Sequence, residues 1–149
     1  MQNSGLIYKT TRMAAGYTQE RLAELCDTSP RSIQAFESGE RIPSDEMVVR
    51  MADVCNCQFL AYQHLRNNME LARSILPEVC PANLPVAVLK LQKEVNDFLV
   101  IRDEMIEITC DGIIDESEQN RWNCILKEIN DVCQAVIALN FVHGGSTHD

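Results

Sequence analysis

The chain has 149 residues, of which 46% are hydrophobic, and a net charge of −9. This composition is typical of a globular protein and excludes wholesale disorder. No apolar run approaches the roughly 18 residues that a membrane span needs, and the first residues lack the apolar core of a signal peptide. We therefore expect a cytoplasmic protein with one ordinary domain or two small ones.

The charge is divided unevenly along the chain. Residues 1–66 hold seven basic and eight acidic residues, whereas residues 67–149 hold six basic and 14 acidic ones. The two segments therefore carry net charges of −1 and −8. Any surface that binds nucleic acid is expected in the near-neutral first segment, because acidic groups repel phosphates.

The seven cysteines form an odd set without the spacing of a disulfide framework. They are Cys26, Cys55, Cys57, Cys80, Cys110, Cys124 and Cys133. The simplest interpretation is reduced thiols that pack as small hydrophobic residues. Cys55 and Cys57 together with His64 form a metal-ligand alternative, but their spacing fits no common zinc template, so we expect no metal.

Residues 1–66 show the pattern of five short helices and form the first predicted domain. Helical periodicity without strand-like alternation predicts an all-α fold. The first helix is expected over 4–15 with Ser4 as its cap, and the fourth over about 45–55. Apolar residues of the fifth are Phe59, Leu60, Tyr62 and Leu65.

Capping residues mark the ends of these helices. Thr18, Ser29 and Ser44 stand where a side-chain oxygen accepts a hydrogen bond from the first helical turn. Pro30 follows Ser29 at the first helical position, where the missing N–H costs little. Gly16 and Gly39 are expected to end the first and third helices.

A proline-rich stretch follows and predicts a linker over 67–85. Three prolines fall within residues 77–85, too many for a continuing helix. Beyond it we expect an antiparallel helical hairpin as the second domain, residues 86–142, and a flexible tail, residues 143–149. Its two long helices are expected over 84–109 and 116–142.

Both long helices carry an apolar stripe. On the first it is expected to comprise Leu84, Val88, Leu91, Val95, Phe98, Leu99, Met105 and Ile106, with Arg102 interrupting the register. On the second it is expected to comprise Trp122, Ile125, Leu126, Ile129, Val132, Cys133, Val136, Ile137 and Leu139. A hairpin alone leaves much of this surface exposed, so a second copy or the first domain must cover it.

The corner of the hairpin, residues 107–118, has two interpretations. Asp115 is expected to cap the last helix, with Glu118 three residues later as the capping-box partner. The same residues match a calcium-binding EF-hand loop at most ligand positions, including Gly112 at its sixth position, although Glu107 stands where Asp is usual. The helix cap explains them without a metal, and calcium stays the alternative.

Residues 18–43 carry the most specific pattern. It is Thr18-Gln19-Glu20-x-Leu22-Ala23-x-x-Cys26-Asp27-x-Ser29-x-x-Ser32-Ile33-x-x-Phe36-Glu37-x-Gly39-x-x-x-Pro43. This pattern resembles the helix-turn-helix of phage repressor and Cro-type (XRE) regulators. The closing helices of the first domain resemble that family too, and the acidic hairpin resembles the C-terminal part of prophage-encoded regulators.

The resemblance implies which residues meet DNA. In such proteins the second helix of the motif lies in the major groove with its N-terminal residues at the base edges. The implied DNA-binding residues are Arg12, Gln19, Ser29, Pro30, Arg31, Ser32, Gln34, Ala35 and Arg41. Arg31 is the best candidate for reading a guanine, although it has phosphate binding alone as an alternative. Gln34 has simple solvation as its alternative, and Glu37 is expected to hold a structural hydrogen bond or ion pair.

The resemblance also implies cysteine and turn roles. Cys26, Cys55 and Cys57 stand at positions that usually hold Leu or Val. Asp27 and Asn56 replace glycines that are common in these turns, and both residue types tolerate a left-handed backbone.

Together these observations predict a DNA-binding transcriptional regulator of phage or mobile-element type. We expect a homodimer, joined through the C-terminal helices, on double-stranded palindromic operator DNA. The alternative is an antitoxin-like or adaptor protein whose hairpin binds a partner protein and whose DNA binding serves autoregulation. No catalytic set or phosphate loop is present, so we expect neither enzymatic activity nor a cofactor.

Overall fold

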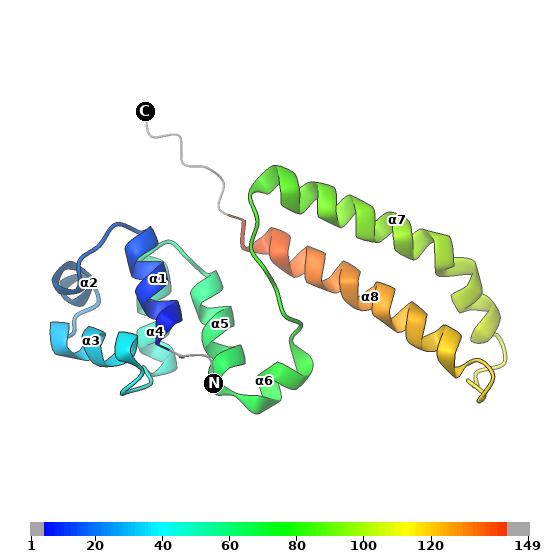
Figure 1. Ribbon diagram of the computed structural model, residues 1–149, viewed down its shortest axis with the longest axis horizontal. Coiled ribbons are helices and arrows are strands. Elements are labelled where there is room, and N and C mark those ends of the chain that lie inside the picture. The colour runs from blue at the N-terminus through cyan, green and yellow to red at the C-terminus, as the bar shows by residue number, and fades with distance from the viewer. Residues whose placement is uncertain (1–4, 143–149) are drawn as a thin grey trace. The chain divides into compact units, whose positions relative to one another are not determined.

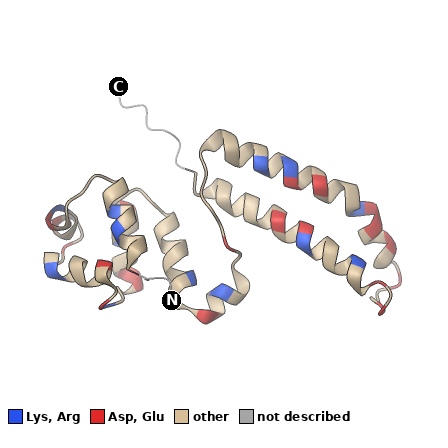
Figure 2. Cartoon of the chain, viewed as in Figure 1, with Lys and Arg blue, Asp and Glu red and all other residues tan. Residues whose placement is uncertain are grey.

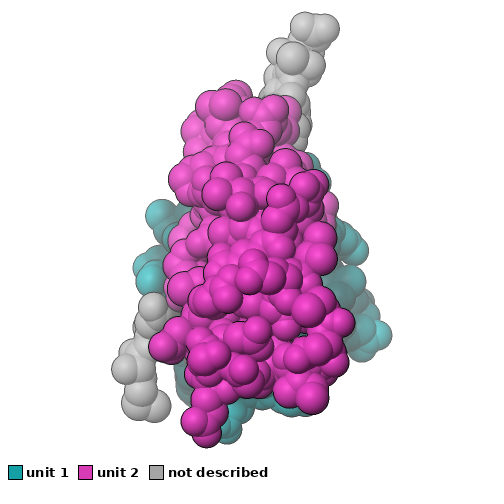
Figure 3. Space-filling model, turned by 90° about the vertical axis from the view of Figure 1, so that its right-hand side faces the viewer, with its two compact units in different colours: residues 1–76 teal, residues 77–149 magenta. Residues whose placement is uncertain are grey.

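The computed structural model describes residues 5–142, and every element in this range is helical. The chain divides into two compact units, Met1–Leu76 and Pro77–Asp149, called here the N-terminal unit and the hairpin (Figures 1 and 3). The predicted all-α fold is confirmed. Ser4 and the tail 143–149, for which a cap and flexibility were predicted, lie outside the described residues. None of the described helices is long and apolar enough to cross a membrane.

The described part of the N-terminal unit contains six helices. They are α1 (Leu6–Ala14), α2 (Gln19–Leu25), α3 (Pro30–Ser38), α4 (Asp45–Val54), α5 (Phe59–Asn68) and α6 (Glu70–Ile75). The sixth was not predicted and lies in the segment expected to be a linker, 67–85. It has six residues, no side-chain cap and no buried residue, so it leaves no clear pattern in the sequence. The boundary between the two units also falls in this segment.

The predicted caps are present. Thr18 and Ser29 accept hydrogen bonds from the third residue of their helices, both at 3.1 Å, and Ser44 accepts one at 3.4 Å. Gly39 ends α3 with φ of 78°. These caps satisfy amide groups that a helix N-terminus leaves without a partner, and they fix where each helix begins.

The core of the N-terminal unit collects apolar side chains from its first five helices. It comprises Tyr8, Leu22, Ala23, Cys26, Ile33, Phe36, Val48, Met51, Ala52 and Leu60. Burial raises the pKa of the half-buried Cys55 thiol to about 11, because the charged thiolate is poorly solvated there. Cys26 packs as a small hydrophobic residue, as predicted. Cys80, Cys110, Cys124 and Cys133 are exposed, so the prediction that they pack as small hydrophobic residues is wrong for these four.

The hairpin consists of α7 (Leu84–Ile108) and α8 (Gln119–Asn140), which lie side by side and run in opposite directions (Figure 1). Asn83 caps α7 by accepting a hydrogen bond from the Val86 amide at 3.1 Å. At the corner, Asp115 accepts from the Glu118 amide at 3.0 Å, and the Glu118 carboxylate accepts from the Asp115 amide at 3.2 Å. This is the predicted capping box, although the regular helix begins three residues later than expected, at Gln119.

The stripe of α7 that packs on α8 differs from the predicted one. It comprises Ala87, Leu91, Glu94, Phe98, Ile101, Met105 and Ile108, all buried or half-buried and spaced alternately by four and three residues. Leu84, Val88, Val95, Leu99 and Ile106 were predicted in this stripe but are 36–59% exposed. The prediction mixed two neighbouring stripes, because Ala87 and Glu94 contribute little to a hydrophobic pattern. The stripe expected on α8 is mixed in the same way: Ile125 is buried, whereas Leu126, Cys133 and Val136 are exposed.

Candidate nucleic-acid interface

The turn between α2 and α3 sets the angle of α3. Asp27 adopts a left-handed backbone with φ of 53°, as predicted, and the Thr28 amide donates to the Ala23 carbonyl at 2.9 Å. This bond across the end of α2 is that of a Schellman motif and stops the helix sharply. Ala23 itself is 1% exposed, and α2 and α3 pack together here. A small side chain at this position lets the two helices approach each other closely.

The third helix has a buried face and an outward face. Ile33, Phe36 and Glu37 are buried. Pro30, Arg31 and Gln34 are exposed, and Ser32 and Ala35 are half-buried. Five of the predicted DNA-binding residues therefore belong to α3 and lie outside its buried face, in its first two turns.

Glu37 connects three helices from its buried position. Its carboxylate accepts hydrogen bonds from Arg12 Nε at 2.5 Å and Arg12 Nη2 at 3.1 Å, and from Gln19 Nε2 at 2.8 Å. Arg12 Nη1 also donates to the Tyr17 carbonyl at 2.6 Å. The hydrogen bonds with Glu37 raise the pKa of Arg12. The expected structural role of Glu37 is confirmed, and α1, α2 and α3 are held together at this point.

This network accounts for the positions of two further predicted DNA-binding residues. The side chain of Arg12 is only 12% exposed and uses three of its nitrogens within the domain. Gln19 is half-buried beside it and has one amide donor committed to Glu37. Contacts of these two side chains with DNA phosphates stay predictions, and both also position α3.

The remaining two predicted residues flank α3. Ser29 caps the helix, and its hydroxyl lies 3.0 Å from the Ser32 hydroxyl, so these two side chains also bind each other. The guanidinium carbon of Arg41 lies 4.8 Å from the centre of the Phe36 ring, which is a cation–π arrangement. Arg41 is exposed and follows the C-terminal end of α3.

Gly5 is a positioning residue that the sequence pattern did not reveal. A Cβ atom at this position would lie 2.4 Å from the Glu37 carbonyl oxygen and 2.6 Å from the Gly39 amide nitrogen. The backbone before α1 therefore packs directly against the C-terminal end of α3. A glycine with an ordinary negative φ gives no local signal of this close approach.

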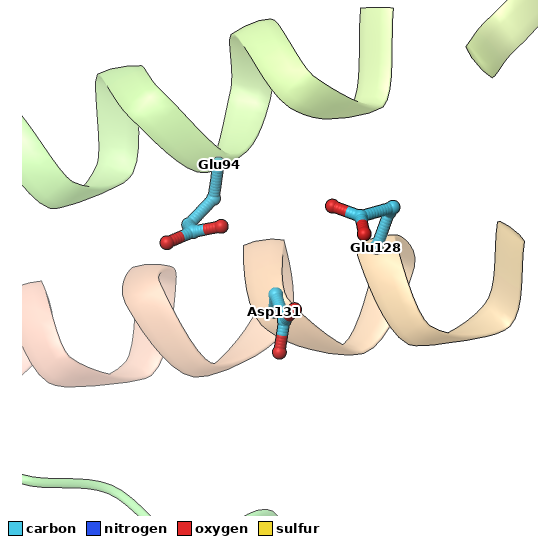
Figure 4. A group of neighbouring side chains, drawn as sticks. All are labelled: Glu94, Glu128 and Asp131. Atoms are coloured by element: carbon cyan, nitrogen blue, oxygen red, sulfur yellow. The ribbon is translucent and has the colours of Figure 1, made fainter. Parts of the chain in front are cut away.

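Among residues 5–142, one group of acidic side chains could hold a metal ion by distance. Glu94, Glu128 and Asp131 have ligand oxygens within 4.8 Å of one another, between α7 and α8 (Figure 4). Lysines lie close to these carboxylates. Lys127 Nζ is 3.2 Å from Glu128 and 2.9 Å from Asp131, and Lys93 Nζ is 3.4 Å from Glu94. These lysines compensate part of the negative charge of the three acids.

The two metal alternatives from the sequence involve other groups. In the corner 107–118, Asp115 accepts three hydrogen bonds from Ser117 and Glu118, so its carboxylate shapes the turn. His64 is buried, with Nδ1 2.7 Å from the Tyr8 hydroxyl and Nε2 3.2 Å from Asp45. Both ring nitrogens therefore have partners other than the cysteines of the zinc alternative.

Comparison with known proteins identifies the N-terminal unit. A family model described as helix-turn-helix matches residues 9–60, which run from α1 into α5. No curated protein and no solved structure matches the chain. Residues 9–60 therefore match a helix-turn-helix family of the XRE type, in agreement with the resemblance found in the sequence.

Proposed function

We propose that the protein is a sequence-specific transcriptional regulator that binds operator DNA through α3. The observation that carries this proposal is the outward surface of α3 in a helix-turn-helix domain. Pro30, Arg31 and Gln34 are exposed there. In a helix-turn-helix protein the N-terminal part of this helix meets the base edges in the major groove.

Arg31 is proposed as the main reader of sequence. Its guanidinium can donate to O6 and N7 of one guanine, a contact worth about 1–3 kcal/mol of discrimination. Arg31 is exposed in the first turn of α3. Ala35 offers a methyl group for contact with thymine, and Gln34 and Arg41 supply polar contacts at the edge of this surface.

Dimeric binding to a palindromic operator follows from the charge of the N-terminal segment. Residues 1–66 carry a net charge of −1, and Arg12 is occupied by Glu37. One copy therefore neutralises few phosphates and has a low, salt-sensitive affinity. Two copies on a two-fold symmetric site add their contacts, as in other helix-turn-helix dimers.

The phage or mobile-element origin rests on the resemblance of the acidic hairpin to prophage-encoded regulators. A regulator of this kind acts on DNA in the cytoplasm. The second candidate function is an adaptor or antitoxin-like protein, and the apolar residues that the hairpin exposes favour it. If the isolated chain is monomeric and a partner protein joins the hairpin stoichiometrically, the second candidate replaces the first.

The experiment that tests the proposal is selection of bound sequences from a random DNA pool at a stated salt concentration. We expect one enriched sequence with two-fold symmetry. Failure to enrich any sequence would contradict sequence-specific binding.

Substitution of Arg31 tests the proposed reading helix. Arg31→Ala is expected to weaken binding to the selected operator about 10-fold to 100-fold, and to change binding to unrelated DNA much less. Arg50→Ala, which removes an exposed arginine of α4, is the matched control. Equal weakening on both DNAs would make Arg31 a phosphate contact instead of a reader. Fluorescence anisotropy with both duplexes separates these outcomes.

A further inference from the structure

Beside the stripe that packs on α8, α7 carries a second apolar stripe that stays partly exposed. It comprises Val88, Val95, Leu99 and Ile106, each of which follows a residue of the inner stripe. Leu99 is 49% exposed and Ile106 is 59% exposed. The positions between them in the same spacing hold Gln92 and Arg102.

The second helix of the hairpin has an equivalent stripe. Trp122, Leu126, Ile129, Cys133 and Val136 follow one another at spacings of four and three residues. Leu126 is 45% and Val136 is 43% exposed, and Cys133 is exposed as well, whereas Trp122 and Ile129 are half-buried. Such regular spacing is that of a packing surface, in which one side chain per half heptad meets a neighbouring helix.

These two stripes lie on the same side of the hairpin. On α7 and on α8 each stripe follows the inward residues by one position, for example Val95 after Glu94 and Leu126 after Ile125. One position rotates the side chain by about 100° around a helix axis. Because the helices are antiparallel, the two rotations bring both stripes to one side. The nine apolar residues of the two stripes are called the open face.

Most of the charged residues of the two helices lie on the opposite side. They precede the inward residues by one position, as Asp97 precedes Phe98 and Asp131 precedes Val132. The ion pair between Arg121 and Glu104, with Nε and Oε1 2.5 Å apart, joins the two helices. Figure 2 shows the charged positions along both helices. Only Arg102 places a charge within the open face.

We propose that the open face is the surface on which a second copy of this chain docks, hairpin against hairpin, to form a four-helix bundle. This inference rests on the proposed function and deepens it, because it names the surface that makes the dimer. The two acidic hairpins can approach each other since none of the acids of α7 and α8 lies in the open face. A two-fold symmetric contact requires one surface to complement itself.

The pattern of α7 meets that requirement. About a midpoint at residue 97, each apolar residue of the stripe has an apolar counterpart at equal distance along the sequence, and one polar residue faces another. The pairs are Val95 with Leu99, Gln92 with Arg102, and Val88 with Ile106. A two-fold axis through this midpoint places apolar residues of one copy on apolar residues of the other, and Gln92 beside Arg102.

The stripe of α8 is symmetric about a midpoint at the same position along the hairpin as residue 97. It centres on Ile129, with Leu126 and Cys133 on either side and Trp122 and Val136 beyond. Contacts of residue 104 with 121 and of residue 94 with 131 place residue 97 beside residue 128. One axis therefore serves both helices.

The size of the open face suits a dimer. It spans residues 88–106 of α7, about 27 Å at 1.5 Å per residue. Two packed helices make it about 20 Å wide, so its flat projection is roughly 500 Å². Interdigitating side chains bury more than the projection, which approaches the roughly 800 Å² per partner of a standard interface.

The test measures the mass of the full chain by light scattering and analytical ultracentrifugation at micromolar concentration. The native chain is expected to be a dimer. Leu99→Glu and Leu126→Glu each place an unpaired charge in the contact and are expected to weaken dimerisation about 100-fold or more. Val100→Glu is the matched control. Val100 is 83% exposed on the same helix but lies outside the open face, so this variant stays dimeric.

A second readout needs no substitution. The Cys133 thiol in the open face is expected to react with a maleimide at least 10-fold more slowly in concentrated than in dilute native protein. The exposed Cys110 at the hairpin corner reacts equally in both. Peptide mass spectrometry separates the two, and circular dichroism checks that each variant is folded.

Three results would overturn the proposal: a monomeric native chain, a dimer that survives both glutamate substitutions, or a dimer equally broken by Val100→Glu. A monomer that binds an unrelated protein through this face would also overturn it. These outcomes are separate from the proposed function. A native dimer that selects no DNA sequence contradicts the function alone. A monomer that does select one contradicts the open face and dimeric binding, but leaves sequence-specific binding through α3 intact.

Discussion

In the N-terminal unit ten apolar side chains, each at most 4% exposed, form one cluster. In the described part of the hairpin only four apolar side chains reach that degree of burial. They are Ala87, Ile108, Ile125 and Ala135. Helices that cross at several angles enclose a core. Two helices that lie side by side bury only the side chains along the contact between them. The N-terminal unit is therefore complete as a single copy, and the hairpin gains stability from whatever covers its open face.

The two units also use buried charge differently. Glu37 sits in the N-terminal unit with three hydrogen bonds from two side chains, so its charge is compensated from several directions. Glu94 lies in the inner stripe of the hairpin, where Lys93 reaches it at 3.4 Å while Glu128 and Asp131 are close. The hydrogen bonds of Glu37 stabilise one arrangement of three helices. Glu94 instead occupies a position of the inner stripe where an apolar side chain would pack against α8.

The largest expected effect belongs to Glu37. Glu37→Ala leaves the guanidinium of Arg12 buried without its partner, which costs about 3–5 kcal/mol of unfolding free energy. Denaturation of the full chain is followed by far-ultraviolet circular dichroism, which reports both units, and by fluorescence of Trp122, the single tryptophan, which reports the hairpin. We expect the loss of stability in the unfolding of the N-terminal unit, which circular dichroism detects and Trp122 fluorescence does not.

The matched control is Glu24→Ala. Glu24 pairs with Arg21 on the surface of α2, and its side chain is 71% exposed, so the loss is expected to stay below about 1 kcal/mol. A shift of the Trp122 transition by Glu37→Ala would show that the two units unfold together and would contradict the comparison.

A pair of glycines gives the next largest effect. Gly5 has an ordinary φ of −73° but no space for a Cβ atom, so Gly5→Ala forces α1 and α3 apart at a cost of about 1–3 kcal/mol. Gly112 has space for a Cβ atom but a φ of 78°, so Gly112→Ala costs about 1 kcal/mol through the backbone alone. Denaturation midpoints of the two variants measure both costs.

DNA affinity separates the two glycine variants further. Gly5→Ala displaces the end of α3 and is expected to weaken operator binding at temperatures where the protein stays folded. Gly112→Ala lies in the hairpin corner and is expected to leave operator binding unchanged. Unaltered binding by a folded Gly5→Ala variant would contradict the positioning role of Gly5.

The smallest expected effect is a gain. Glu94→Leu replaces a charged residue of the inner stripe with an apolar one and removes its repulsion with Glu128 and Asp131, which is expected to stabilise the hairpin by about 1 kcal/mol. Trp122 fluorescence during denaturation measures it. Glu107→Leu, at an exposed position of α7, is the control and brings no comparable gain. A less stable Glu94→Leu hairpin would mean that the carboxylate has a structural role of its own.

Local chemistry made the N-terminal unit predictable. Caps at Thr18, Ser29 and Ser44 depend on a side chain and its own helical turn, and the left-handed turns at Asp27 and Asn56 are equally local. The close approach of Gly5 to α3 was not predictable, because it depends on a backbone more than thirty positions away. The hydrogen bonds of Arg12 and Gln19 with Glu37 were not predictable either, since a sequence does not show which basic or amide side chain an acid will contact.

The hairpin was predictable as two helices but not in its packing. Two apolar stripes lie side by side on each helix, so hydrophobic spacing alone cannot tell the buried one from the exposed one. On α7, Ala87 and Glu94 belong to the stripe that is buried against α8. Ala87 is small and lets the helices approach, and Glu94 can be enclosed because Lys93 lies nearby.

The residues that form and anchor α3 differ from those proposed to read DNA, and this separation affects how the domain can diversify. Ser29, Pro30 and Ser32 define the start of the helix, and Ile33, Phe36 and Glu37 anchor it. Arg31, Gln34 and Ala35 take part in neither task. On the proposed function, exchanges at these three positions retarget the protein to another operator while the scaffold stays intact, so paralogues with different targets can arise from a handful of codon changes.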